Sequence, residues 1–259
     1  MNGQNSLNNQ LIIVSKDGKV EHKISGHLRT VRETILSEKN PLDWFSIATS
    51  KTLEKVLNTI AEIDNVSVIS AQRACDLQFP PGHPQERLVY AKHPAKQTTY
   101  FPLAGFHRFA FEHKFAEAIR LLAALGASNI QAEHVKGWGQ EFAANLAGAF
   151  AATGETASID AGHTRSDNSR LLFTSTLEGH ALPTIPDDLV WYPFEPMWQA
   201  IANNRTEHGL KKFSLTLTYT EDFGINAGLK AQLSKASLEI GGNFEEHQST
   251  VWTLSGDFV

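Results

Sequence analysis

Apolar and polar residues alternate strictly along a stretch near the C-terminal end of the sequence. In residues 223–233 the odd positions are apolar and the even positions are Gly or polar, whereas in residues 236–244 the apolar face falls on the even positions. The parity changes around Ser234 and Lys235. Because opposed residues of an antiparallel hairpin share a face, this pattern predicts a hairpin that turns at these two residues.

The register of this hairpin can be tested on the sequence by pairing residues whose numbers sum to 469. Leu217 then opposes Trp252 on the apolar face, and Lys230 opposes Glu239 on the polar face. On the polar face Asp222 also opposes His247, Ser214 opposes Ser255 and Lys212 opposes Asp257. The sequence therefore predicts one long hairpin that covers residues 212–257.

The tip of this hairpin also has helical spacing. Ile225, Leu229, Leu233 and Ala236 recur at intervals of four, four and three residues, and Ala, Leu, Lys and Gln are good helix formers. The alternative is an ordinary surface helix at residues 226–236 that links two strands of a sheet. A segment that satisfies both periods is also a candidate for a change between helix and strand.

Two amphipathic helices are expected upstream, at residues 103–125 and 195–208, each ended by a Gly. An alternating pattern follows each of them, over residues 129–177 and 211–258. In the first of these patterns, a fainter hairpin is expected at residues 142–161. The chain therefore resembles two pseudo-repeats of a helix followed by a long hairpin.

The first hundred residues have shorter patterns of both kinds. Together with the pseudo-repeats they predict an α+β fold, with an antiparallel sheet built from the two repeats. The expected domains are a small N-terminal α+β unit at residues 1–100 and a two-repeat sheet domain at residues 101–259. In the N-terminal unit we expect a hairpin of strands at residues 10–14 and 19–25 with its turn at Asp17-Gly18. Further strands are expected at residues 65–69 and 88–91, and helices at residues 28–36 and 51–63.

Composition narrows the class of protein. The 259 residues carry a net charge of −5 with scattered Lys and Arg, so we expect no nucleic-acid partner. Cys75 is the one cysteine and cannot form an internal disulfide, which favours a reducing compartment. No apolar run approaches the roughly 18 residues of a membrane-spanning helix. We therefore expect a soluble protein that is cytoplasmic as synthesised.

The sequence lacks motifs of known enzyme chemistry. It has 11 histidines but no HExxH, CxxC, GxSxG or Walker sequence. His107 and His113 lie six positions apart on one helix and point to nearly opposite faces, so they cannot bind one metal ion together. Cys75 is more typical of a small buried residue than of a nucleophile. We expect no enzyme activity, no metal and no cofactor.

The expected hairpins have the length and alternation of membrane-spanning strands. A tilted strand needs about 9 to 11 residues to cross a bilayer, and apolar residues facing lipid then alternate with small polar residues facing water. Such strands are stable only in a closed barrel, which here requires a homo-oligomer with membrane lipid as its partner. The residues expected to insert are Phe142, Leu146, Phe150, Ile159, Phe223, Ile225, Leu229, Leu233, Leu238, Ile240 and Phe244.

This arrangement resembles the gasdermins and the perforin and cholesterol-dependent cytolysin group. In those families a bent central sheet carries two separate segments that convert into membrane-inserting hairpins. The matching stretches are residues 142–161 and 223–244, within a resemblance that covers residues 126–258. Gly241-Gly242 echoes the perforin-type glycine pair, although the aromatic-Gly-Thr-His signature before it is absent. The resemblance implies a pore-forming protein that reaches the membrane after activation.

Two other interpretations stay open. Trp191, Tyr192 and Trp198 form an interfacial membrane anchor or partner site in one interpretation, and cap the core where the second helix docks in the other. The alternative function is a non-enzymatic ligand-binding or scaffold protein with an ordinary antiparallel sheet. An enzyme that uses Cys75 or a histidine is the third possibility.

Overall fold

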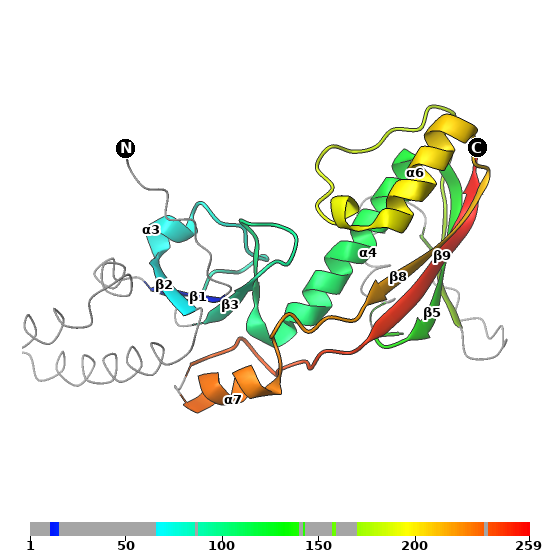
Figure 1. Cartoon of the computed structure of the whole chain (residues 1–259). Coiled ribbons are helices and arrows are strands. Elements are labelled where there is room, and N and C mark those ends of the chain that lie inside the picture. The colour runs from blue at the N-terminus through cyan, green and yellow to red at the C-terminus, as the bar shows by residue number, and fades with distance from the viewer. Residues whose placement is uncertain are drawn as a thin grey trace, which may run out of the picture. The chain divides into compact units, whose positions relative to one another are not determined.

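The chain forms two compact units in a computed structural model (Figure 1). The first unit comprises Met1–Phe106 and Phe223–Glu246, and the second comprises His107–Asp222 and His247–Val259. A segment between two late strands of the sequence therefore belongs with the N-terminal part of the chain. The structure describes residues 11–15, 66–85, 88–139, 142, 157–158, 170–235 and 238–259.

The first unit contains a four-stranded sheet in the order β2-β1-β3-β4. β1 pairs with β2 in parallel, and the other neighbours are antiparallel. Three of the four expected strands in this part of the chain are confirmed to within a residue. The expected strand at residues 19–25 and the two expected helices lie outside the described residues. The elements are β1 (Leu11–Ser15), β2 (Val66–Ser70), the short helix α3 (Ala71–Ala74), β3 (Val89–Lys92) and β4 (Tyr100–Pro102).

Two helices of the second unit confirm the expected helical segments. The 3₁₀ turn η2 (Leu103–Gly105) leads into α4 (Phe106–Ala124), and α6 (Pro196–His208) follows later in the chain. Gly209 ends α6 with a φ of 65°, a left-handed conformation that glycine adopts without a steric penalty.

A five-stranded antiparallel sheet completes the second unit, in the order β6-β7-β5-β9-β8. Its long strands are β5 (Ala127–Lys136), β7 (Arg170–Thr176), β8 (Lys212–Tyr219) and β9 (Thr250–Phe258), and β6 (Ala157–Ser158) is short. α4 packs on the buried face of the sheet, where the rings of Phe115 and Trp252 lie 5.4 Å apart. α6 is joined to the end of α4 by a 3.0 Å hydrogen bond from Arg205 Nε to Leu125 O. The fold is therefore α+β, as expected.

The predicted register is confirmed where β8 and β9 pair. Every pair from Lys212 with Asp257 to Tyr219 with Thr250 has residue numbers that sum to 469. β8 alternates exposed and buried residues along its whole length, and its buried positions are the apolar ones. A one-residue slip would turn these side chains to solvent, which is why the parity of the pattern fixes the register.

The first pair of this ladder has a measurable pH dependence. Hydrogen bonds from Lys212 and then Asn129 hold the pKa of Asp257 below its ordinary value. A carboxyl with a depressed pKa stabilises the fold above its unfolded pKa, and that contribution is lost as the pH falls through the folded pKa. We expect carboxyl NMR to show that the pKa of Asp257 lies below the ordinary value of an aspartate and that Lys212→Met raises it. An unchanged titration in the variant would contradict this.

The long hairpin does not continue beyond β8 and β9, which corrects the prediction for residues 220–249. In its place the chain forms α7 (Ala227–Lys235), so the alternative of a surface helix is confirmed (Figure 1). Asn226 begins this helix, because its Oδ1 accepts hydrogen bonds from the backbone N–H groups of Gly228 and Leu229 at 3.1 and 3.2 Å. The expected pairing of Leu229 with Ile240 is therefore absent from this form of the protein.

Candidate functional site

The candidate site is the tip segment, which we define as Phe223–Glu246. It leaves the sheet after β8, contains α7 and returns to β9. Phe223 and Gly224 have φ angles of 49° and 75°, and Gly241 and Gly242 have φ angles of 89° and 132°. An extended strand requires negative φ at each of these positions. The left-handed residues therefore mark where the backbone departs from the path of a strand.

The apolar residues of the tip segment are only partly covered. Ile225 and Leu233 are fully buried. The ring of Phe223 lies 6.4 Å from that of Phe106, and the Nζ of Lys230 lies 5.6 Å from the ring centre of Phe244. The remaining residues expected to insert from this segment are half-buried, namely Phe223, Leu229, Leu238, Ile240 and Phe244.

The first expected hairpin is described only in part. Phe142 has a helical backbone and is buried, with its ring 4.9 Å from that of Phe111 and 5.4 Å from that of Trp252. In this form of the protein it is a core residue of the second unit rather than part of an alternating strand, because three aromatic neighbours enclose it. The other expected residues of this hairpin, Leu146, Phe150 and Ile159, lie outside the described residues.

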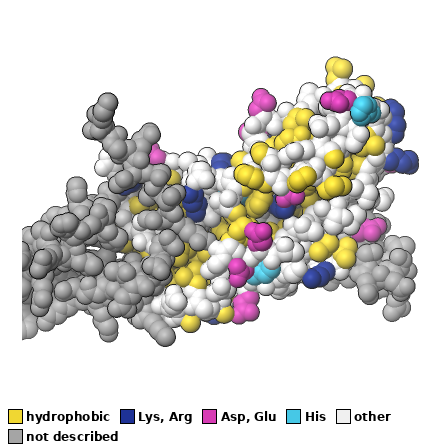
Figure 2. All heavy atoms as spheres, in the orientation of Figure 1, with side chains coloured by type: hydrophobic (Ala, Val, Ile, Leu, Met, Phe, Trp, Pro, Cys, Tyr) yellow, Lys and Arg dark blue, Asp and Glu magenta, His cyan; other side chains and the backbone are white. Residues whose placement is uncertain are grey.

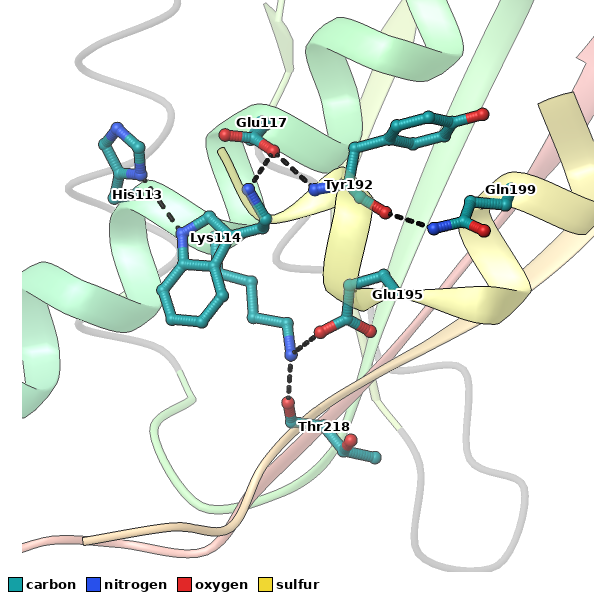
Figure 3. A network of polar contacts seen from close by, with 8 residues as sticks. His113, Lys114, Glu117, Tyr192, Glu195, Gln199 and Thr218 are labelled. Atoms are coloured by element: carbon teal, nitrogen blue, oxygen red, sulfur yellow. Dashed lines mark hydrogen bonds and ion pairs between the residues drawn. The ribbon is translucent and has the colours of Figure 1, made fainter. Parts of the chain in front are cut away.

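The aromatic residues near the start of α6 are held by a buried carboxylate on α4. Glu117 accepts backbone hydrogen bonds from Val190 at 2.8 Å, from Trp191 at 2.6 Å and from Tyr192 at 3.0 Å. Figure 3 shows the bond from Tyr192. Trp191 and Trp198 are buried and Tyr192 is half-buried. In this form of the protein, these residues thus lie where the core-capping interpretation places them.

Lys114 joins this network to the edge of the sheet. Its Nζ forms a 2.5 Å ion pair with Glu195 and donates a 2.9 Å hydrogen bond to the backbone oxygen of Thr218 in β8 (Figure 3). It also lies over the ring of Trp191, and the indole N–H of Trp191 donates to His113 at 3.1 Å. The sequence reasoning missed these residues, although a Lys and a Glu on the apolar face of a helix were the available signal.

The outer edge of β8 carries backbone groups that point away from β9. The N–H of Phe258 donates to the backbone oxygen of Lys211, so Lys211 and Phe258 form a hydrogen-bonded pair. Because hydrogen-bonded and non-hydrogen-bonded pairs alternate along an antiparallel ladder, the odd-numbered residues of β8 are the ones that bond to β9. The even-numbered residues therefore direct their N–H and C=O groups outward. Among the described strands β8 is the edge of the sheet, and Lys114 covers one outward carbonyl, that of Thr218.

Titratable residues elsewhere in the second unit have structural contacts. His107 is buried and its Nδ1 lies 3.0 Å from the hydroxyl of Tyr219. Burial, followed by the charges of Asp222 and Glu221, raises the pKa of Tyr219 above its ordinary value, so its hydroxyl stays neutral.

Cys75 is exposed, which corrects the expectation of a buried residue. It follows α3 at a helix end, where its Sγ donates to the backbone oxygen of Ala71 at 3.4 Å. Within the part of the chain that the structure describes, no three His, Cys, Asp or Glu residues gather in a way that would hold a metal ion.

Comparisons with protein-family models, with curated proteins and with solved structures find no match for this chain. Across the described helices, none combines the length and apolar character needed to cross a membrane.

Proposed function

We propose that this protein is a pore-forming protein that is made soluble, oligomerises and inserts amphipathic β-hairpins into a membrane. The tip segment would unfold from α7 and extend β8 and β9 into the bilayer. One observation carries the proposal: the sum of residue numbers that pairs β8 with β9 also matches residue types within the tip segment, from Ile225 with Phe244 to Leu233 with Ala236, although the structure forms the helix α7 there.

The continued register matches residues that the compact form does not pair. In the extended hairpin Leu229 would oppose Ile240 on the face toward lipid, and Lys230 would oppose Glu239 on the face toward water. α7 does not require this alternation, because Leu233 is the fully buried residue within the described part of this helix and Ile225 lies before its start. Packing in the compact form therefore does not explain the alternation of apolar and polar residues in the tip segment. Such alternation is typical of strands that face lipid on one side and water on the other.

The helical state of the tip segment has a small intrinsic stability. Isolated helices shorter than about 12 to 15 residues are marginal in water, and α7 has nine residues. A non-glycine residue in the left-handed region, as at Phe223, costs on the order of 1 kcal/mol. Because of both features, the tip segment would lose its helical structure at a small cost in free energy when lipid contacts its apolar residues.

The antiparallel sheet of the second unit suits edge-to-edge assembly. The four long strands β7, β5, β9 and β8 alternate in direction. β7 of a second copy would therefore pair antiparallel with β8 once the two-residue strand β6 has left its place beside β7. The outward backbone groups of β8 would supply the hydrogen bonds. A ring of copies then closes the barrel that lipid requires.

The experiment is dye release from liposomes, combined with negative-stain imaging and hydrogen exchange. We expect release from vesicles of mixed zwitterionic and anionic phospholipid, ring-shaped particles, and changed exchange at residues 142–161 and 223–244 on membrane binding. The reason is that the apolar residues of both segments would pack against protein before insertion and contact lipid after it. Unchanged exchange at both segments, in a sample shown to bind membrane, would contradict insertion.

The second candidate function is a non-enzymatic ligand-binding or scaffold protein. The observation that favours it is α7 itself, because a surface helix that links two strands needs no functional explanation. This candidate predicts that the alternation in the tip segment affects only folding. The liposome experiment separates the two, since a scaffold protein releases no dye.

A further inference from the structure

The tip segment lies directly on the sheet of the first unit. Leu88, beside β3, forms an isolated parallel bridge with Glu239, and the N–H of Val89 donates to the oxygen of Glu239 at 2.8 Å. A Cβ added to Gly241 would come within 3.1 Å of Leu88 and 3.3 Å of Pro102. The backbone at Gly241 therefore rests against two side chains of the first unit, at a φ of 89° that favours glycine.

A second contact surrounds Ala104, in the 3₁₀ turn before α4. The N–H of Ala104 donates to the oxygen of Ile240 at 2.9 Å, and its oxygen accepts from the N–H of Glu245 at 2.8 Å. In the extended hairpin, Ile240 would be the hydrogen-bonded partner of Leu229, because the ladder pairs odd residues of the first strand. The backbone of Ile240 therefore forms its hydrogen bond either with Ala104, as in the structure, or with Leu229, as in the proposed hairpin.

We propose that the sheet of the first unit and the turn at Ala104 form an autoinhibitory latch, which holds the tip segment of the same unit in its helical form. This inference rests on the proposed function, because a latch matters only if the tip segment moves. The contacts of Leu88 and Ala104 keep the returning half of the segment, residues 239–245, away from the strand path. Pore formation then requires that these contacts open before the hairpin forms.

A reversible disulfide tests the latch in the full-length chain. Cysteines replace Leu88 and Glu239 in a Cys75→Ser background, and bridged strands lie about 4.8 Å apart, within the span of a disulfide. We expect the oxidised protein to release dye at least tenfold more slowly than the reduced protein, with recovery after reduction. The matched control is Thr216→Cys with Thr253→Cys, a facing pair of β8 and β9 that stays paired in both states. Its oxidation should leave release within about twofold.

The outcomes separate the latch from the proposed function. Equal release by the oxidised and reduced Leu88–Glu239 pair overturns the latch and leaves pore formation standing. No release by the wild-type protein and none by Gly241→Val, the variant described next that opens these contacts, overturns pore formation and the latch with it.

A second pair of variants avoids any change to the core residue Leu88. Gly241→Val and Gly224→Val both place a side chain at positive φ, and both positions face water in the extended hairpin. A Cβ at Gly224 meets no atom within 4 Å, whereas one at Gly241 meets the first unit. We expect Gly241→Val to release dye several-fold faster than Gly224→Val. Equal rates would overturn the latch, because the two variants differ in that contact.

Discussion

Ala231→Lys is expected to reduce dye release about tenfold, whereas Gln232→Lys leaves release within about twofold. The two residues are neighbours on the exposed side of α7, and both have good helix propensity, so the compact form treats them alike. In the extended hairpin Ala231 faces lipid and Gln232 faces water. A basic residue on the lipid face costs about 2 to 4 kcal/mol at the bilayer midplane and less toward the interface.

Leu229→Lys and Ile240→Lys place the charge closer to the midplane and should abolish release. Both residues are half-buried in the compact form, so the thermal stability of each variant must be measured beside its activity. The Ala231 and Gln232 pair needs no such correction, which makes it the sharper test. Equal loss of activity in these two neighbours would show that the alternation serves folding rather than insertion.

The spacing of apolar residues was sufficient to predict an element where it followed either the helical or the strand period alone. The helices α4 and α6 followed from apolar spacing and from the glycines that end them. The β8 and β9 register followed from parity, because the sheet buries one face and any slip would expose that face. These elements form the frame from which the tip segment leaves.

The tip segment could not be assigned from its sequence because it satisfies both periods. The returning half of the segment, at Glu239, Ile240 and Glu245, contacts Leu88, Val89 and Ala104, which lie far upstream in the chain. Local propensity does not report such contacts, and helix and strand patterns often coincide in short apolar segments.

The contacts of Glu117 on α4 could not be predicted from the sequence because they depend on tertiary structure. The sequence around residues 190–192 does not predict that the backbone N–H groups of these residues bind one carboxylate. That convergence depends on the path of the loop beside α4, which brings residues 190–192 to Glu117. The sequence reasoning named these aromatic residues but missed the buried carboxylate that accepts hydrogen bonds from the backbone of Trp191 and Tyr192.

Glu117→Ala should be among the most destabilising single substitutions in the second unit, by about 3 kcal/mol. It removes a carboxylate that is 6% exposed and leaves three backbone N–H groups without their acceptor. Hydrogen bonds to a charged group contribute about 1.5 to 3 kcal/mol each, and partial rehydration of the loop recovers some of the loss. Urea denaturation followed by tryptophan fluorescence measures the effect, since Trp191, Trp198 and Trp252 all belong to the second unit.

The matched control is Glu112→Ala, which removes a carboxylate from the same helix. Glu112 forms a partly exposed ion pair with Arg108 at 3.2 Å, one helical turn away. Such pairs contribute about 0.3 to 0.5 kcal/mol, so the control should unfold close to the wild type. Glu117→Gln keeps one acceptor oxygen and is expected to fall between the two. Similar losses for Glu117→Ala and Glu112→Ala would mean that the three N–H groups find water readily and that the carboxylate does not hold the loop.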